Sequence, residues 1–252
     1  MTLPNESNGS KGSNESPRLW TDQLIQHAAG PWAAARQHPF VRALGDHTLP
    51  RERFTYFIGQ DAVYLLDFSR VLAMGAAKSA GRSDERLFLR HADTVHAVEA
   101  ALHQDLGPRL GLSAKALAST VPGPVTVAYQ DHLVRTAWTE PLAVLVAALL
   151  PCYVLYQDVA RLMVPTAPVP GVPEYREWID TYAGDAYGEA VAEMTALANR
   201  LGRALDPAVA ARAARAHWRS VRYEWLFWEQ AWTEGAHFAA SRLGPEPSWP
   251  QP

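Results

Sequence analysis

The single cysteine of this chain, Cys152, has a sequence context that makes it a candidate nucleophile. It follows Pro151 in the apolar stretch LLPCYVLYQDVARLM, and Tyr156 stands four residues later, on the same face of a helix. A lone cysteine most often serves as a small apolar residue of a core. A thiol near a helix N-terminus, where Pro151 would fit, has a lowered pKa and is a better nucleophile. Both interpretations of Cys152 remain open from these residues.

Two carboxylates also lie in apolar surroundings, where a charge is costly unless a donor faces it. Asp61 lies in FIGQDAVYLLDF with Tyr64 three residues later. It is either a structural partner of a neighbouring helix or an anchor for the amine and ring N–H donors of a ligand. Glu224 lies among aromatic residues in RYEWLFWEQAW, which should raise its pKa and suit a general acid or base. The alternative for Glu224 is an ion pair at the protein rim with Arg219 or Arg222.

Two tyrosines in polar-aromatic motifs add to this set. Tyr129 lies in VAYQDHL and Tyr182 in EWIDTYAGDAY, and their hydroxyl groups need partners if they are buried. Several tyrosines together with a cysteine, an aspartate and a glutamate would form a pocket with flat walls and a few polar points. Such a pocket suits a flat heteroaromatic ligand.

The elements that must position these side chains are helices. From Leu19 to about Ala240 the apolar residues recur at helical spacing, and alternating runs typical of strands are scarce. We therefore expect an all-α fold, a compact bundle of about seven or eight helices with sites between facing helices. The clearest helices are expected at about 49–80, 83–107, 125–138, 141–163, 173–200 and 207–236.

Composition at the two ends predicts one catalytic domain between two tails. Residues 1–17 are rich in Asn, Ser and Gly and are expected to be a disordered polar tail, and residues 241–252 a loose proline-rich tail. The first residues lack the apolar core of a signal peptide. A single helical domain is expected over residues 18–240.

Charge and cysteine content narrow the possible partners. The net charge of -3 and the pI of about 6.3 argue against nucleic-acid binding. One cysteine forms no internal disulfide, which fits a reducing cytoplasm. The longest apolar stretch, PLAVLVAALLPCYVLY, contains Pro151 and is expected to be a buried helix and not a membrane span.

Four motifs, in this order, resemble the TenA family of aminopyrimidine aminohydrolases, also called thiaminase II. They are HPFVRALGDHTLPRERFTYFIGQDAVYL, AALLPCYVLYQDV, YREWIDTYAGDAY and YEWLFWEQAW, and the resemblance covers roughly residues 20–235. It implies the haem-oxygenase-like fold without haem, no metal or other cofactor, and a homotetramer. The implied activity is thiamin salvage: hydrolysis of 4-amino-5-aminomethyl-2-methylpyrimidine to the hydroxymethylpyrimidine and ammonia, with cleavage of thiamin as a second reaction.

The resemblance also implies roles for particular residues. Cys152 matches the family's catalytic cysteine and Glu224 its catalytic glutamate. Asp61 matches the residue that anchors the pyrimidine and Tyr64 the ring that stacks on it. Further substrate contacts are implied for Tyr129, Tyr156 and Tyr182. The chain departs from the family at Val127, where some members carry a second tyrosine, and this difference is expected to alter the pocket wall.

Two other functions compete with this interpretation. One is a metal-dependent oxidase on the same fold, for which Glu99 and His103, with His96 nearby, could bind a metal ion. A di-iron site needs carboxylates on several helices with matching histidines, and the sequence does not supply that set. The other is a non-catalytic regulator that binds a pyrimidine without converting it.

Overall fold

The computed structural model describes residues 19–101 and 105–235, and within these ranges the chain is helical and contains no strand. This confirms the predicted all-α class. The predicted tails, residues 1–17 and 241–252, lie outside the described residues. The helices of the described ranges are α1 (Trp20–His27), α2 (Ala29–Arg36), α3 (Pro39–Gly45), α4 (Arg51–Lys78), α5 (Arg82–Ala101), α6 (Gly107–Arg109), α7 (Ala114–Ala118), α8 (Pro124–Thr139), α9 (Leu142–Met163), α10 (Pro173–Ala183), α11 (Asp185–Gly202) and α12 (Pro207–Trp232).

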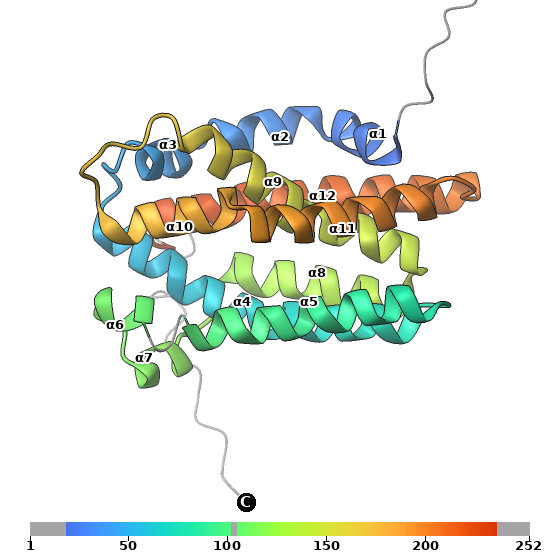
Figure 1. Cartoon of the computed structure of the whole chain (residues 1–252), viewed down its shortest axis with the longest axis horizontal. Helices are drawn as coiled ribbons and strands as arrows, with labels where there is room; N and C mark the ends of the chain where they lie inside the picture. The colour runs from blue at the N-terminus through green and yellow to red at the C-terminus, as the bar shows by residue number, and fades with distance from the viewer. Residues whose placement is uncertain (1–18, 102–104, 236–252) are drawn as a thin grey trace, which may run out of the picture.

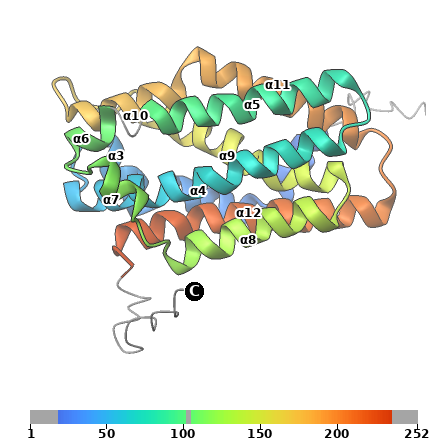
Figure 2. The ribbon, with the colours of Figure 1, turned by 90° about the horizontal axis from the view of Figure 1, so that it is seen from below.

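The bundle is built around α9. This helix is long and apolar enough by composition to cross a membrane, but 83% of its most apolar window is buried inside the bundle. The helix α12 packs along it most extensively, and α10 and α11 cover it from another side. The helix α4 packs against α5 and α8, as Figure 2 shows. The apolar stretch is therefore the core helix, as the sequence predicts.

Twelve helices in the described ranges exceed the predicted seven or eight, because several expected helices are divided. The segment expected as one helix over 173–200 breaks at Gly184, whose ψ of 166° is extended. A Cβ at Gly184 would lie 2.8 Å from the carbonyl oxygen of Asp180, so the break needs glycine there. The break starts α11 in a new direction, and this places Tyr187 toward α9.

Two buried glutamines hold α4, α8 and α12 in register. The side-chain oxygen of Gln60 in α4 accepts hydrogen bonds from the backbone N–H of Gly123 (2.8 Å) and the hydroxyl of Thr126 (2.6 Å). Gln230 in α12 accepts a bond from the backbone N–H of Val125 (3.0 Å) and donates one to Thr126 (3.0 Å). Because amides buried at this depth need all these partners, they fix the start of α8 against both neighbours.

The long helices α4 and α5 approach closely where a glycine faces an aromatic ring. A Cβ at Gly75 would lie 2.6 Å from the ring of Phe88, which is completely buried. The absence of a side chain at Gly75 lets the ring fill the space between the two helices. This contact sets the distance at which α5 covers the pocket described next.

Candidate active site

Cys152 lies in a pocket of about 140 Å³ between α4, α5, α9, α10 and α11. Four of the other predicted site residues line the same pocket: Asp61, Tyr64, Tyr156 and Tyr182. The pocket is smaller than a typical site for a drug-sized ligand, so its volume suits a molecule of one small ring. Its walls are mostly apolar and aromatic.

The remaining two predicted residues, Tyr129 and Glu224, join this group behind the thiol. The hydroxyl of Tyr129 lies 3.0 Å from Cys152 Sγ and donates a 2.6 Å hydrogen bond to Glu224 Oε1. The hydroxyl of Tyr64 lies 2.8 Å from the same sulfur. The structure thus brings all seven predicted residues together, although they come from five different helices.

The helix expected over about 141–163 is α9, but the alternative that placed Cys152 near a helix N-terminus is wrong. Pro151 lies in the middle of α9, where its missing N–H leaves the carbonyl of Ala147 without its usual helical donor. The dipole of a helix N-terminus therefore does not act on the thiol. The packing of α10, α11 and α12 around this buried helix overrides the helix-breaking tendency of proline. Next to it, the carbonyl of Cys152 accepts a 2.6 Å hydrogen bond from Tyr187.

The electrostatics of the site keep the resting thiol protonated. Burial raises the pKa of Cys152 well above its ordinary value, and the nearby Glu224 carboxylate raises it further, while the hydrogen bonds from Tyr129 and Tyr64 oppose this. The expected low pKa is thus absent. A nucleophilic Cys152 needs a base within reach, and the Tyr129 hydroxyl connects it to Glu224.

Glu224 has the environment of a general acid or base. It is only 2% exposed, and burial raises the pKa of its carboxyl to about 7, with Tyr129 and Cys152 hydrogen bonds acting in the opposite direction. The alternative of a rim ion pair is wrong, because its hydrogen-bond partner is a buried tyrosine. Arg222 instead lies over the ring of Trp218 on the outer side of α12.

Asp61 faces the pocket without a protein partner. It is 5% exposed, and burial raises the pKa of its carboxyl to about 7. Among the described residues, none lies within hydrogen-bond distance of this carboxylate. The interpretation of Asp61 as a structural partner of a neighbouring helix is therefore wrong. A buried carboxyl with free oxygens at a pocket wall is suited to receive donors from a ligand.

Aromatic rings form the walls on both sides of these groups. The ring of Tyr64 packs on Tyr129 (centroids 5.1 Å apart), and that of Tyr156 on Tyr182 (5.1 Å). Burial raises the pKa of all four hydroxyl groups well above 10, so they are protonated donors at neutral pH. Val127 is 40% exposed and does not line the pocket, so the expected effect of this residue on the wall is wrong.

Three polar residues around the pocket were not predicted from the sequence: His91, Tyr153 and Tyr187. His91 Nδ1 lies 3.0 Å from the Tyr153 hydroxyl, and its Nε2 lies 2.9 Å from Glu193. Tyr153 directly follows Cys152, and Tyr187 belongs to the motif that contains Tyr182, so the sequence could have identified both as pocket residues. No sequence signal identifies His91, because only the packing of α5 on α4 and α11 brings it to the pocket.

The residues of the metal-oxidase alternative fall largely outside what the structure describes. His103 belongs to the undescribed segment 102–104, and the side chain of Glu99 is not described either. His96 is an exposed residue of α5. Among the described residues, no group of three or more His, Cys, Asp or Glu side chains is placed to hold a metal ion.

Known proteins resemble this chain in sequence and in fold over most of its length. It is 33% identical over 222 residues to the aminopyrimidine aminohydrolase of Bacillus subtilis, covering 86% of this chain and 93% of that protein. The solved structure of a TenA homologue from P. horikoshii superposes with a TM-score of 0.79 at 27% identity, covering 87% of this chain and 100% of that one.

A more distant structure shows the fold alone. Haem oxygenase-1 from the cyanobacterium Synechocystis superposes with a TM-score of 0.62 at 14% identity, covering 90% of this chain and 97% of that one. This likeness confirms the predicted haem-oxygenase-like architecture. The TENA/THI-4/PQQC family matches residues 25–234, which include all the residues of the pocket. The chain therefore belongs to the TENA/THI-4/PQQC family.

Proposed function

We propose that this protein is an aminopyrimidine aminohydrolase of thiamin salvage. Its substrate would be 4-amino-5-aminomethyl-2-methylpyrimidine, and its products the hydroxymethylpyrimidine and ammonia. The observation that carries the proposal is the hydrogen-bonded group of Cys152, Tyr129 and Glu224 beside a partnerless buried carboxyl, Asp61. The likeness to the Bacillus subtilis aminopyrimidine aminohydrolase supports it. Cleavage of thiamin to the same pyrimidine and the thiazole alcohol is proposed as a second reaction.

Asp61 and the tyrosines would bind and orient the pyrimidine. The free oxygens of Asp61 would accept hydrogen bonds from the 4-amino group and a protonated ring nitrogen. Tyr64 would stack on the ring, and Tyr156 and Tyr182 would close the opposite wall. The pocket volume of about 140 Å³ matches a single substituted ring. This arrangement would hold the substrate methylene at the sulfur of Cys152.

In the first step, Cys152 would attack the methylene carbon. Its thiol proton would pass to the Glu224 carboxylate. Glu224 would deliver this proton to the amine as the C–S bond forms and the C–N bond breaks, so that the nitrogen departs as ammonia. The Tyr129 hydroxyl bridges the two groups and would stabilise the charge that moves from sulfur to carboxylate. The pKa of about 7 suits Glu224 to both directions of transfer.

In the second step, water would replace the sulfur. Glu224, now ionised, would take a proton from a water molecule as its oxygen bonds to the methylene carbon and the C–S bond breaks. The proton held by Glu224 would return to the Cys152 sulfur. The cycle thus consumes one water and leaves both residues as they began, so the chemistry needs only groups of this pocket and water.

The wider setting of the enzyme is proposed from the family resemblance and from composition. We propose a homotetramer in the cytoplasm that acts on a small-molecule pyrimidine or thiamin and binds neither nucleic acid nor a membrane. The single cysteine fits a reducing cytoplasm, and the net charge of -3 argues against nucleic-acid binding. The burial of α9 within the bundle argues against its use as a membrane span.

Ammonia release from the aminomethylpyrimidine tests the proposal. The wild type should turn over, Cys152→Ala should be inactive, and mass spectrometry of quenched wild-type reactions should detect the pyrimidine-methyl adduct on Cys152. Turnover by Cys152→Ala at the wild-type rate would contradict the covalent step. Tight pyrimidine binding without any turnover by the wild type would instead identify a binding protein, and iron-dependent turnover an oxidase.

A further inference from the structure

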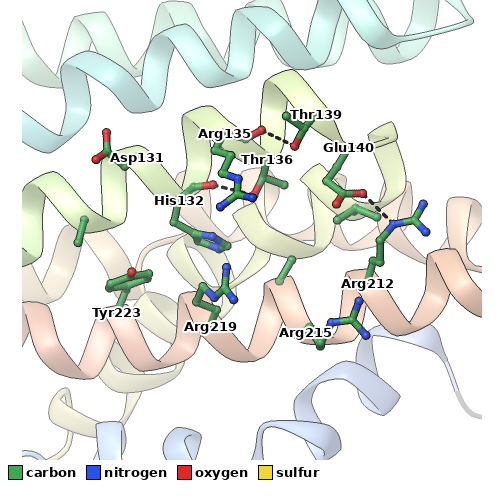
Figure 3. A pocket seen from close by; sticks show the side chains of 13 residues that line it. Asp131, His132, Arg135, Thr136, Thr139, Glu140, Arg212, Arg215, Arg219 and Tyr223 are labelled. Carbon is green, nitrogen blue, oxygen red and sulfur yellow. Dashed lines mark hydrogen bonds and ion pairs between the residues drawn. The ribbon is translucent and has the colours of Figure 1, made fainter.

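A second cavity, of about 520 Å³, lies between α8 and α12, outside the pocket of Cys152. Four arginines line it, and we call it the arginine groove: Arg135 from α8 and Arg212, Arg215 and Arg219 from α12. The three on α12 follow at intervals of three and four residues, so they occupy one face of that helix. The helix packing thus turns a row of arginines toward a single hollow, which Figure 3 shows from close by.

The positive charges of the groove are mostly uncompensated. Arg212 pairs with Glu140 at 2.9 Å. Among the described residues, no carboxylate lies within 4.0 Å of the guanidinium groups of Arg135, Arg215 or Arg219. Asp131 also lines the groove, but in Figure 3 its carboxylate points away from the arginines. Three free cations therefore gather in one hollow of a protein whose net charge is -3.

The positive charge of the groove affects the pKa of a buried histidine in its wall. The ring of His132 is 8% exposed, and its Nε2 lies 3.1 Å from the hydroxyl of Ser220. Burial, together with the positive charges of Arg219 and Arg135, lowers the pKa of His132 to about 4. The ring is neutral at pH 7, so it adds no charge of its own. The arginine charges therefore disfavour a second positive charge on His132, and no anion in the described residues neutralises them.

We propose that the arginine groove binds a small phosphate-bearing anion on the guanidinium groups of Arg135, Arg215 and Arg219. Guanidinium forks match phosphate oxygens in pairs of parallel hydrogen bonds, which is the geometry for which arginine is best suited. The volume is that of a small-molecule site. A nucleic acid would need a broad basic surface, and the acidic balance of this chain argues against one.

The groove also offers an aromatic surface next to its charges. Tyr223 lines it and stacks on Tyr129, with ring centroids 5.1 Å apart and an interplanar angle of 17°. The ring centroids of His132 and Tyr223 are 5.6 Å apart. A phosphate ester of an aromatic compound could therefore place its ring near Tyr223, whereas inorganic phosphate or diphosphate would use the arginines alone. Both sources share the same phosphate chemistry.

Isothermal titration calorimetry on the full chain at low salt tests the proposal. The probes are inorganic diphosphate and phenyl phosphate, and the variants are Arg219→Gln and Arg135→Gln. The control is Arg222→Gln, which removes the same charge from an exposed position of α12 outside the groove. We expect saturable binding at one site that weakens at least about tenfold in each groove variant and stays within about twofold in the control.

The outcomes separate the ligand classes. Tighter binding of phenyl phosphate supports an aromatic phosphate ester, and tighter binding of diphosphate supports a free diphosphate. Absence of saturable binding for both probes overturns the proposal, and so does equal weakening in Arg222→Gln, since a general charge effect would explain it. The substituted side chains are exposed, so melting temperatures close to that of the wild type are expected and verify folding.

Discussion

The hydroxyl of Tyr129 donates a 2.6 Å hydrogen bond to Glu224, across the contact between α8 and α12. The same hydroxyl lies 3.0 Å from the sulfur of Cys152. One buried group therefore connects the proposed nucleophile to the proposed base. The consequences of this connection can be measured by changing either end of the hydrogen bond.

Replacement of Glu224 by glutamine removes the proton acceptor but keeps the shape of the side chain. We expect kcat in Glu224→Gln to fall by about 10²–10⁴-fold, because proton transfer to and from a positioned group contributes that much. Steady-state ammonia release measures this effect. Glu234→Gln, exposed just beyond α12, is the matched control and should keep wild-type kcat. A Glu224→Gln enzyme within threefold of the wild type would exclude the acid–base role.

Replacement of Tyr129 by phenylalanine should shift the pH profile. Its hydrogen bond stabilises ionised Glu224 and lowers the pKa of that carboxyl, so its loss should raise this pKa above about 7. Since Glu224 must be ionised to accept the thiol proton, the acid limb of kcat/KM should move to higher pH by about one unit or more.

The control for this shift is Tyr175→Phe. Tyr175 is equally buried but donates its hydrogen bond to the carbonyl of Leu49, away from the pocket. The pH profile of kcat/KM in Tyr175→Phe should match that of the wild type. An unchanged acid limb in Tyr129→Phe would show that Glu224 does not govern it.

Replacement of Asp61 by asparagine should raise stability at alkaline pH. The folded pKa of about 7 lies above the ordinary value of 3.8, so the cost of ionising the buried Asp61 is small below pH 4 and grows until about pH 7. Above pH 7 it is on the order of 4 kcal/mol. The stabilisation by Asp61→Asn should therefore increase by about 2.5 kcal/mol between pH 5 and pH 8.

Denaturant unfolding at both pH values measures this difference. Asp67→Asn is the control, because Asp67 lies on the same helix in a surface ion pair with Arg70. It should show no such increase with pH. A stability change of Asp61→Asn that is independent of pH would mean that the folded pKa of Asp61 is ordinary. We also expect weaker pyrimidine binding in Asp61→Asn, since the anchor loses its charge.

The close contact between α4 and α5 should make stability sensitive to a side chain at Gly75. Gly75→Ala would push a methyl group into the buried ring of Phe88 and should destabilise the protein by about 1–3 kcal/mol. Gly30→Ala is the matched change in open space, since no atom lies within 4 Å of its added Cβ. It should be neutral or stabilise by up to about 1 kcal/mol. Equal melting temperatures for the two variants would contradict the close packing.

The sequence predicted the main helices because their apolar residues follow helical spacing over long stretches. It also predicted that Cys152 and Tyr156 share a face of one helix. It also suggested that Cys152 could lie near a helix N-terminus, because proline is disfavoured inside a helix, but Pro151 lies in the middle of α9, where the surrounding helices outweigh that tendency. The break at Gly184 was not predicted, because a single glycine within a helical pattern is often tolerated and does not by itself indicate a helix end.

The composition of the site was more predictable than its electrostatics. Asp61 and Glu224 stood out as carboxylates among apolar neighbours, and both are buried. The raised pKa of Cys152 could not be predicted, because it depends first on the complete burial of the thiol between helices and then on the position of Glu224, 72 residues away in the chain. His91 was missed because its partners, Tyr153 and Glu193, lie on other helices.

The burial of α9 has a consequence for how the protein is made. This helix carries almost no charge before its last turns, and its most extensive partner, α12, is the last helix of the described chain. During synthesis, α9 emerges well before the segment that covers it. The growing chain must therefore keep this apolar helix from aggregating until α12 has been synthesised. Chaperone supply and protein concentration should govern the yield of this protein more than the speed of forming any single helix.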